Sequence, residues 1–243
     1  MEKFNLTSFK TTDELASHVA SLWLDEIEKP ARAGRRHCVA LSGGRITKNL
    51  FNSVVQQAQT RATLFESVHF FWADERYLPS DDPESNFRLA QEQLFAPLGI
   101  HGNQIHRIRG EDTPEVCVKS AEEELCRIAP HNSAGCPTLD LVLLGMGEDG
   151  HVASLFPNTP AKIANHSDPF VFIDHSPKPP PRRVSLSYTA IAAARLVWVL
   201  ISGPGKEAAL RESLSSGKTP LGRVIQSRQN TWIFSQIEAV EKI

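Results

Sequence analysis

Two hydrophobic periods alternate along the chain, one typical of amphipathic helices and the other of buried strands. Apolar residues at helical spacing predict helices over residues 11–29, 47–59, 86–94, 114–128 and 207–214, with a helical turn over 190–194. Short apolar runs predict strands over residues 37–41, 68–72, 105–108, 139–144, 169–173, 184–186 and 196–201. Because strands and helices alternate, the pattern predicts a three-layer α/β fold around a mainly parallel sheet.

The first predicted helix carries signals at both ends. Thr11 is followed three residues later by Glu14, which is the spacing of a capping box. The proline and glycine of residues 30–34 are expected to end the helix. No internal repeat, low-complexity tract or convincing linker interrupts the chain, so residues 1–243 are expected to form a single domain.

The amino-acid composition limits the kinds of molecule that the chain is expected to bind. The chain has 243 residues, a formal net charge of −2, 41% hydrophobic residues and 22% charged residues. Near-neutral charge gives no general attraction to nucleic acid or to anionic membranes, so a phosphorylated ligand would need a local cationic cluster. No apolar run approaches the ~18 residues that a bilayer crossing needs, and the N-terminal residues lack a secretory pattern. We therefore expect a cytoplasmic protein, either a monomer or a weak homodimer.

The cysteines and histidines give no metal or disulfide pattern. The four cysteines lack C-x-x-C spacing and are expected to be reduced thiols. The nine histidines are scattered and form no H-E-x-x-H or similar close set of ligands. From spacing alone, no metal site is expected.

Most of the residues that suggest a catalytic site lie in one stretch of the chain, residues 139–151. The apolar run at residues 139–144 is followed by Gly145, Gly147 and Gly150, and His151 comes directly after the last glycine. In an open α/β sheet, ligands bind beyond the carboxyl ends of the central strands. Backbone N–H groups in a glycine-rich loop there can face an anion or a developing oxyanion. His151 is the candidate for general acid–base chemistry.

Similar junctions follow other predicted strands. The run at 37–41 leads into Ser42-Gly43-Gly44 and then a helix, a layout typical of an anion-binding turn. Asp74 and Arg76 follow shortly after the run at 68–72. The guanidinium group of Arg76 could bind a phosphate or a carboxylate, because its geometry matches both. A third glycine junction after residue 201 contains Lys206.

The glycine-rich stretch also carries a family resemblance. Residues 145–157 read GMGEDGHVASLFP and closely resemble the G-M-G-x-D-G-H-x-A-S-L-F-P motif of the 6-phosphogluconolactonases. Residues 72–88 resemble the W-x-D-E-R and D-x-x-S-N-x-R block of that family. The resemblance covers nearly the whole chain. It implies the modified Rossmann-like fold shared by these lactonases, ribose-5-phosphate isomerases and glucosamine-6-phosphate deaminases.

The resemblance implies hydrolysis of 6-phospho-D-glucono-1,5-lactone, a sugar-phosphate lactone, with no metal or organic cofactor. His151 would activate water, and Asp149 would orient His151 or simply fix the loop. The expected substrate-binding residues are Ser42, Gly43, Gly44, Arg45, Asp74, Arg76, Gly147, Gly150, Arg182, Arg183 and Lys206. The resemblance leaves open which of Arg182 and Arg183 faces the site. The glycine spacing at residues 145–150 also matches a dinucleotide fingerprint, but the next residue is His151, and no acidic residue stands ~20 positions on at the end of a second strand.

The chain departs from the family pattern at one point. Where the family has L-S-G-G-S-T-P-K, residues 41–48 read LSGGRITK, so Arg45 and Ile46 replace hydroxyl side chains. Arg45 is therefore expected to fold over the bound phosphate. The alternative, that Arg45 points to solvent while backbone N–H groups hold the phosphate alone, stays open. Two alternatives stay open: a sugar-phosphate isomerase or deaminase of the same fold, and a non-catalytic sugar-phosphate sensor. The V-A-S-L-F-P sequence after His151 favours the lactonase, since the isomerases and deaminases have an I-A-F-N-E-P-like segment there.

Overall fold

A computed structural model describes residues 3–61, 65–133 and 135–237. Nine strands are described in that part of the chain: β1 Phe4–Ser8, β2 His37–Leu41, β3 Val68–Trp72, β4 Asp74–Arg76, β5 Leu141–Gly145, β6 Phe170–Ile173, β7 Arg183–Leu186, β8 Leu196–Ile201 and β9 Thr231–Ser235. The α-helices are α1 Thr12–Arg32, α2 Arg45–Ala58, α3 Asn86–Ala90, α4 Ala96–Leu98, α5 Pro114–Ile128, α6 Ala161–Ala164, α7 Tyr188–Ala193, α8 Glu207–Ser215 and α9 Pro220–Gln226. Short helical turns are η1 Phe65–Ser67 and η3 Gly102–Gln104, of the 3-10 type, and η2 Gln91–Phe95, of the π type.

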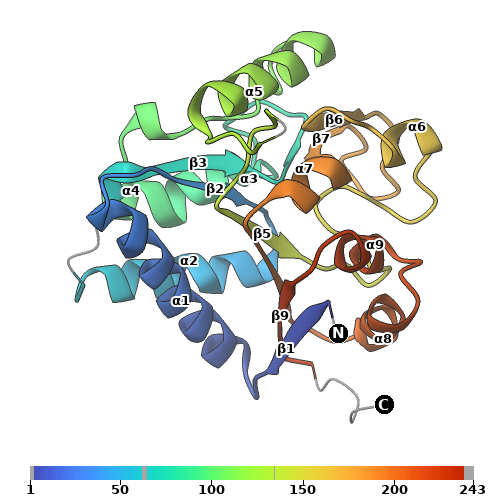
Figure 1. The fold of residues 1–243 in the computed structure, drawn as a ribbon, viewed down its shortest axis with the longest axis horizontal. Coiled ribbons are helices and arrows are strands. Elements are labelled where there is room, and N and C mark those ends of the chain that lie inside the picture. Colours follow the sequence, from blue (N-terminus) through green and yellow to red (C-terminus); the bar gives the residue numbers. More distant parts are fainter. Residues whose placement is uncertain (1–2, 62–64, 134, 238–243) are drawn as a thin grey trace.

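The main sheet is entirely parallel and has the strand order β1-β9-β8-β5-β2-β3. In Figure 1, α1 and α2 lie side by side against one side of this sheet, and α7, α8 and α9 gather on the other. This arrangement confirms the predicted three-layer α/β fold. The buried apolar runs of β2, β5 and β8 explain it, because a parallel sheet covered by helices has no polar face.

A second, antiparallel sheet has the order β4-β7-β6. The sequence predicted β6 and β7 and placed Asp74, Glu75 and Arg76 just after the end of β3, but it did not predict that they form a strand. After Ala73 these three residues form β4, which pairs with β7. The carboxylates of Asp74 and Glu75 are buried there, so charge alone was a poor guide to exposure.

Several predicted boundaries need correction. The predicted strand at 105–108 is wrong, since Ile105 makes only an isolated bridge to Phe70. Strands β1 and β9 and helix α9 had not been predicted. Helix α1 continues through residue 30 to residue 32 instead of ending before the proline. Its predicted start is confirmed, because the Glu14 N–H donates to the Thr11 hydroxyl over 3.1 Å.

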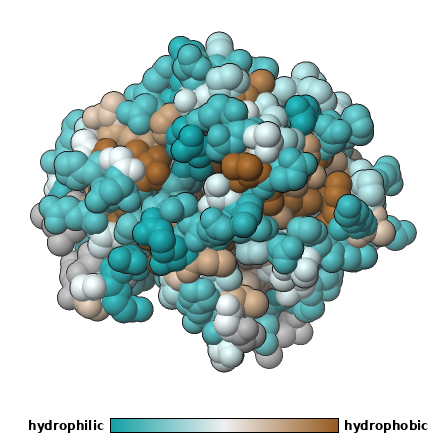
Figure 2. Space-filling model, turned by 90° about the horizontal axis from the view of Figure 1, so that it is seen from above, coloured by the Kyte–Doolittle hydropathy of each residue, from teal (hydrophilic) through white to brown (hydrophobic). Residues whose placement is uncertain are grey.

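The surface carries little exposed apolar area. Figure 2 shows one face on which hydrophilic residues dominate and apolar residues form small separate patches. In the described part of the chain, Val116 is the only large hydrophobic residue that is exposed to solvent. Not one of the described helices combines the length and apolar character that crossing a bilayer demands.

Strand β5 lies in the middle of the main sheet, so a cavity there should lower the stability of the fold. Leu141 is fully buried and is paired with Leu196 on β8 and Val39 on β2. We expect Leu141→Ala to lower the free energy of unfolding by about 2–5 kcal/mol in urea titrations, since neighbouring strands cannot collapse into the space. The control Val116→Ala, at a 50% exposed position, should change it by less than about 0.5 kcal/mol. Similar losses for both variants would contradict this assignment of the core.

Candidate active site

A pocket opens where the carboxyl ends of β2, β5 and β8 meet. Its volume is ≈ 150 Å³, and its wall is more polar than apolar. Ten of the predicted site residues line it: Ser42, Gly43, Gly44, Arg45, Asp74, Arg76, Gly147, His151, Arg183 and Lys206. Asp149, Gly150 and Arg182 do not line it. The parallel sheet therefore brings together residues from three separate strand ends, as the pattern predicted.

The turn between β2 and α2 forms one side of the pocket. Gly43 must be glycine, because a Cβ there would lie 1.9 Å from the side-chain oxygen of Asn86. Gly44, with φ of 112°, is the N-cap of α2, and no side chain caps this helix end. Backbone N–H groups of the first turn of α2 thus lack side-chain partners at the pocket wall. This is the geometry in which helix N-termini bind anions.

The hydroxyl groups of this turn are already engaged. Ser42 donates to the carbonyl of Leu143 over 2.8 Å, and Thr47 donates to the carbonyl of Gly43 over 3.0 Å. Both bonds tie the turn to its surroundings, the first to strand β5 and the second to the first turn of α2. Ser42 lines the pocket, yet its hydroxyl proton serves the fold, so it is not free to donate to a ligand.

His151 and Asp149 form a hydrogen-bonded pair. The Nδ1 atom of His151 lies 2.5 Å from Oδ1 of Asp149, and the His151 N–H donates to the same oxygen over 3.2 Å. The imidazole packs on the ring of Phe156 with centroids 4.5 Å apart. A Cβ at Gly147 would lie 2.0 Å from this imidazole, so glycine is required for the ring to sit there. Asp149 stands behind His151 and leaves the Nε2 side of the ring for chemistry.

The same contacts shift the pKa values of the pair. Burial lowers the pKa of His151 below its usual value, while the hydrogen bond and the charge of Asp149 oppose this shift. Burial alone would raise the pKa of Asp149, but the bond and charge of His151 bring it below its usual value. His151 is therefore held as a neutral imidazole near pH 7, the form that can accept a proton.

The backbone of the glycine loop does not offer all the donors that the sequence suggested. The Gly147 N–H donates to the carbonyl of His151 over 2.9 Å, and the Gly150 N–H donates to the carbonyl of Gly147 over 3.0 Å. Both groups close the loop on itself, so they are not free to bind an oxyanion. Gly150 also lies outside the pocket, with φ of 76° and its carbonyl bonded to the Leu221 N–H. Donors for a developing negative charge must come from elsewhere.

Two groups of cations lie on the pocket wall. Arg45 reaches toward the β8–α8 junction, where a Cβ on Gly203 would lie 3.6 Å from its guanidinium. Burial and the nearby positive charge of Arg45 lower the pKa of Lys206. At the other group, burial lowers the pKa of Arg183, and Asp74 opposes this shift across 3.9 Å. Arg76 also influences Arg183, and its Nε is buried without a hydrogen-bond partner in the structure described.

The structure separates the two neighbouring arginines. The Arg183 side chain is 6% exposed and donates to carbonyls of Pro179 and Pro180. The Arg182 side chain is 47% exposed, pairs with Asp174 and stacks over the ring of Tyr77. Arg182 therefore braces the rim, and its predicted role in substrate binding does not fit its position. Arg183 begins β7, where successive side chains point to opposite faces.

Sequence reasoning missed Asn86, which lines the pocket and donates to the carbonyl of Asp74 over 2.9 Å. It is held by Glu75, a carboxylate only 2% exposed that accepts from the N–H groups of Arg76, Asn86 and Phe87. Burial raises the pKa of Glu75 to about 7, although these bonds pull it down. Asn86 was visible in the motif at residues 72–88, but only its contact with Gly43 reveals a place at the site.

Comparisons with known proteins agree on one group of enzymes. Residues 10–233 match the family described as glucosamine-6-phosphate isomerases/6-phosphogluconolactonase. A 6-phosphogluconolactonase of Mycobacterium tuberculosis is 34% identical over 243 residues, which cover 96% of each chain. The structure of 6-phosphogluconolactonase from Thermotoga maritima has a TM-score of 0.81 at 27% identity, covering 96% of this chain and 99% of that one. The 6-phosphogluconolactonase of Trypanosoma brucei has a TM-score of 0.82 at 26% identity, covering 97% of each chain.

The pairing of His151 with Asp149 can be tested without any substrate. In Asp149→Asn the imidazole loses the negative charge that opposes its burial, so its pKa should fall further. An NMR pH titration of the His151 ring should show this decrease, against Asp174→Asn as a control for an exposed carboxylate beside another histidine. An unchanged or higher pKa of His151 in Asp149→Asn would contradict the electrostatic role of Asp149.

Proposed function

Because the chain belongs to the family of glucosamine-6-phosphate isomerases and 6-phosphogluconolactonases, we propose that it hydrolyses 6-phospho-D-glucono-1,5-lactone to 6-phospho-D-gluconate. The relatives named above are lactonases, and the similarity spans almost the full length of both chains. The observation that carries the proposal is that His151, bonded to Asp149 behind it, lines the same pocket as an uncapped helix N-terminus and a cationic cluster. This combination supplies a base beside an anion site.

His151 acts as the general base. With Nδ1 bonded to Asp149, the neutral ring uses Nε2 to take a proton from water, and the resulting hydroxide attacks the lactone carbonyl carbon. The tetrahedral intermediate then expels the ring oxygen, which takes the proton back from the imidazolium and becomes the sugar C5 hydroxyl. The new carboxylic acid loses its proton to solvent. Asp149 stabilises the imidazolium between these two transfers.

The phosphate binds at the β2–α2 turn. The start of α2 lines the pocket and has no side-chain cap, and Arg45 and Lys206 lie close enough that one lowers the pKa of the other. Two cations that repel each other when the pocket is empty would both be stabilised by a phosphate dianion. Arg45, which replaces a hydroxyl residue of the family motif, thus contributes charge where its relatives have neutral donors.

The lactone itself lies toward Asp74, Arg76 and Arg183. Since the Gly147 and Gly150 N–H groups are used within their loop, we assign stabilisation of the oxyanion to Arg76. Its buried Nε lacks a partner among the described atoms, while its Nη1 donates to the carbonyl of Glu84 over 2.6 Å. A preoriented guanidinium with a free donor suits a charge that develops only in the transition state.

An assay on both candidate substrates tests the proposed reaction. The purified protein should accelerate opening of 6-phosphogluconolactone, measured as 6-phosphogluconate formed after subtraction of spontaneous hydrolysis. It should release no ammonia from glucosamine-6-phosphate. Turnover of the amino sugar instead would identify a deaminase, and turnover of neither would support a sensor.

Loss of the base should be visible in kcat. In His151→Ala we expect kcat to fall by ~10²–10⁴, the usual contribution of general base catalysis, while KM changes little because the phosphate anchor is intact. His175→Ala is the matched control, since its side chain is 92% exposed. Near-normal turnover in His151→Ala would remove this residue from the mechanism.

The two cationic groups should differ in their substrate dependence. Lys206→Ala and Arg45→Ala should each lower kcat/KM for the phosphorylated lactone by roughly 10–150-fold and affect unphosphorylated gluconolactone less than about twofold, because only the phosphate meets these charges. Arg76→Ala should impair both substrates alike, since each develops the same oxyanion. Equal losses on both substrates for Lys206→Ala would rule out the phosphate anchor.

A further inference from the structure

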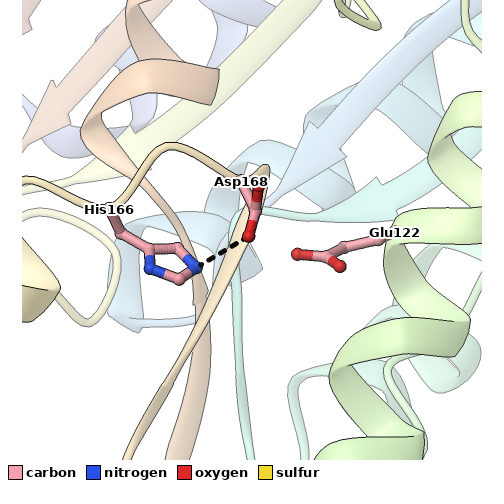
Figure 3. Close-up of side chains that lie close together, drawn as sticks. All are labelled: Glu122, His166 and Asp168. Carbon is pink, nitrogen blue, oxygen red and sulfur yellow. Dashed lines mark ion pairs between the residues drawn. The ribbon is translucent and has the colours of Figure 1, made fainter.

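Three potential metal ligands meet away from the catalytic pocket. Glu122 lies on α5, and His166 and Asp168 lie on the segment between α6 and β6, so they are distant in the sequence. Figure 3 shows their side chains turned toward a common point. One donor atom from each lies within 4.8 Å of the others, and His166 Nε2 is 3.7 Å from Asp168 Oδ2. Glu122 and His166 also line a broad surface hollow between α5 and β6.

The donors have the chemistry of a transition-metal site. One imidazole nitrogen and two carboxylate oxygens are ligands that Zn²⁺ and similar divalent ions accept. Donors around a tetrahedral zinc ion lie about 3.3 Å apart, so the present spacing must contract by roughly 1.5 Å at most. Asp168 is 64% exposed and His166 is 30% exposed, so both side chains have room for that movement.

The cluster lacks a compensating cation. Among the residues that the structure describes, neither Glu122 nor Asp168 forms an ion pair with a lysine or arginine. Two carboxylates that face one another at this distance repel, and a divalent ion between them would reverse that repulsion.

The backbone around the ligands is fixed by hydrogen bonds. The Thr189 hydroxyl donates to the carbonyl of His166 over 3.0 Å, and the Ser187 N–H donates to the carbonyl of Pro169 over 2.9 Å. The Phe170 N–H donates to Glu122 over 3.4 Å. Contacts of this kind hold ligands near the geometry of the bound state, so metal binding would require side-chain adjustment only.

We propose that Glu122, His166 and Asp168 bind one divalent transition-metal ion, with water completing its coordination. The ion joins α5 to the entry of β6. Strand β6 pairs with β7, and Ile173 is the partner of Arg183 in that register. The ion therefore holds the small sheet against α5, and this sheet places Arg183 at the active site. The role of the ion is structural and separate from the hydrolysis.

Calorimetric titration of the full chain with Zn²⁺ tests the site. We expect one binding event that persists in His151→Ala, which excludes coordination by the catalytic pair. Glu122→Gln and His166→Ala should weaken it by at least about tenfold, since each removes a ligand. His175→Ala is the matched control, because His175 lies beside Asp174 at the same hollow without a third ligand, and it should bind like the unaltered protein.

Thermal unfolding provides a second measurement on the same proteins. Zn²⁺ should raise the Tm of the unaltered protein and of His175→Ala, because an ion bound only by the folded state stabilises it. It should not raise the Tm of His166→Ala, whose ellipticity without metal verifies folding. Absence of zinc binding to the unaltered protein, or equal affinity in His166→Ala, would overturn the proposal.

Discussion

The parallel pairing of β5 with β2 and β8 is the constraint on which the site depends. It aligns three strand ends at one edge of the sheet, so that three loops distant in sequence share one pocket. The bond from the Ser42 hydroxyl to the carbonyl of Leu143 locks two of those ends together. Because all three strands are buried on both faces, the register cannot slip without exposing apolar side chains or burying loop groups.

The alignment of the strand ends places several charged side chains in one small pocket, and the neighbours of each side chain determine what it can do. Asp149 is bonded to the ring of His151 and opposes the effect of burial on its pKa, which suits the proposed base: neutral at rest and charged during turnover. Asp74 accepts from the Ser154 hydroxyl over 2.7 Å and partly neutralises Arg183. Among the described residues, no ion pair with a carboxylate is formed by Arg45 or Lys206, although the charge of Glu148 raises the pKa of Lys206 and opposes the effect of Arg45. At one end of the pocket Asp74 thus partly neutralises the positive charge, and at the other end Arg45 and Lys206 keep theirs.

The sequence predicted the layers, the parallel sheet and most of the pocket, because buried strands and glycine junctions have strong local patterns. It failed where the outcome depends on contacts between distant segments. Strand β4 is too short and charged to give a pattern, and only pairing with β7 defines it. The Gly150 N–H looked available until its bond within the loop was seen. The difference between Arg182 and Arg183 depends on one residue of strand register, and the grouping of Glu122 with His166 depends on the docking of α5.

In the hydrolysis that we propose, His151 is the base, and its surroundings keep it neutral before the reaction. The most direct measurement compares two pKa values for the free enzyme: that of the His151 ring by NMR, and that of the acidic limb of kcat/KM for 6-phosphogluconolactone, corrected for spontaneous opening. We expect the two pKa values to coincide and to lie below the usual histidine pKa of about 6.5, because burial disfavours the imidazolium. Two clearly different values, or a kcat/KM that does not fall toward acid pH, would contradict it.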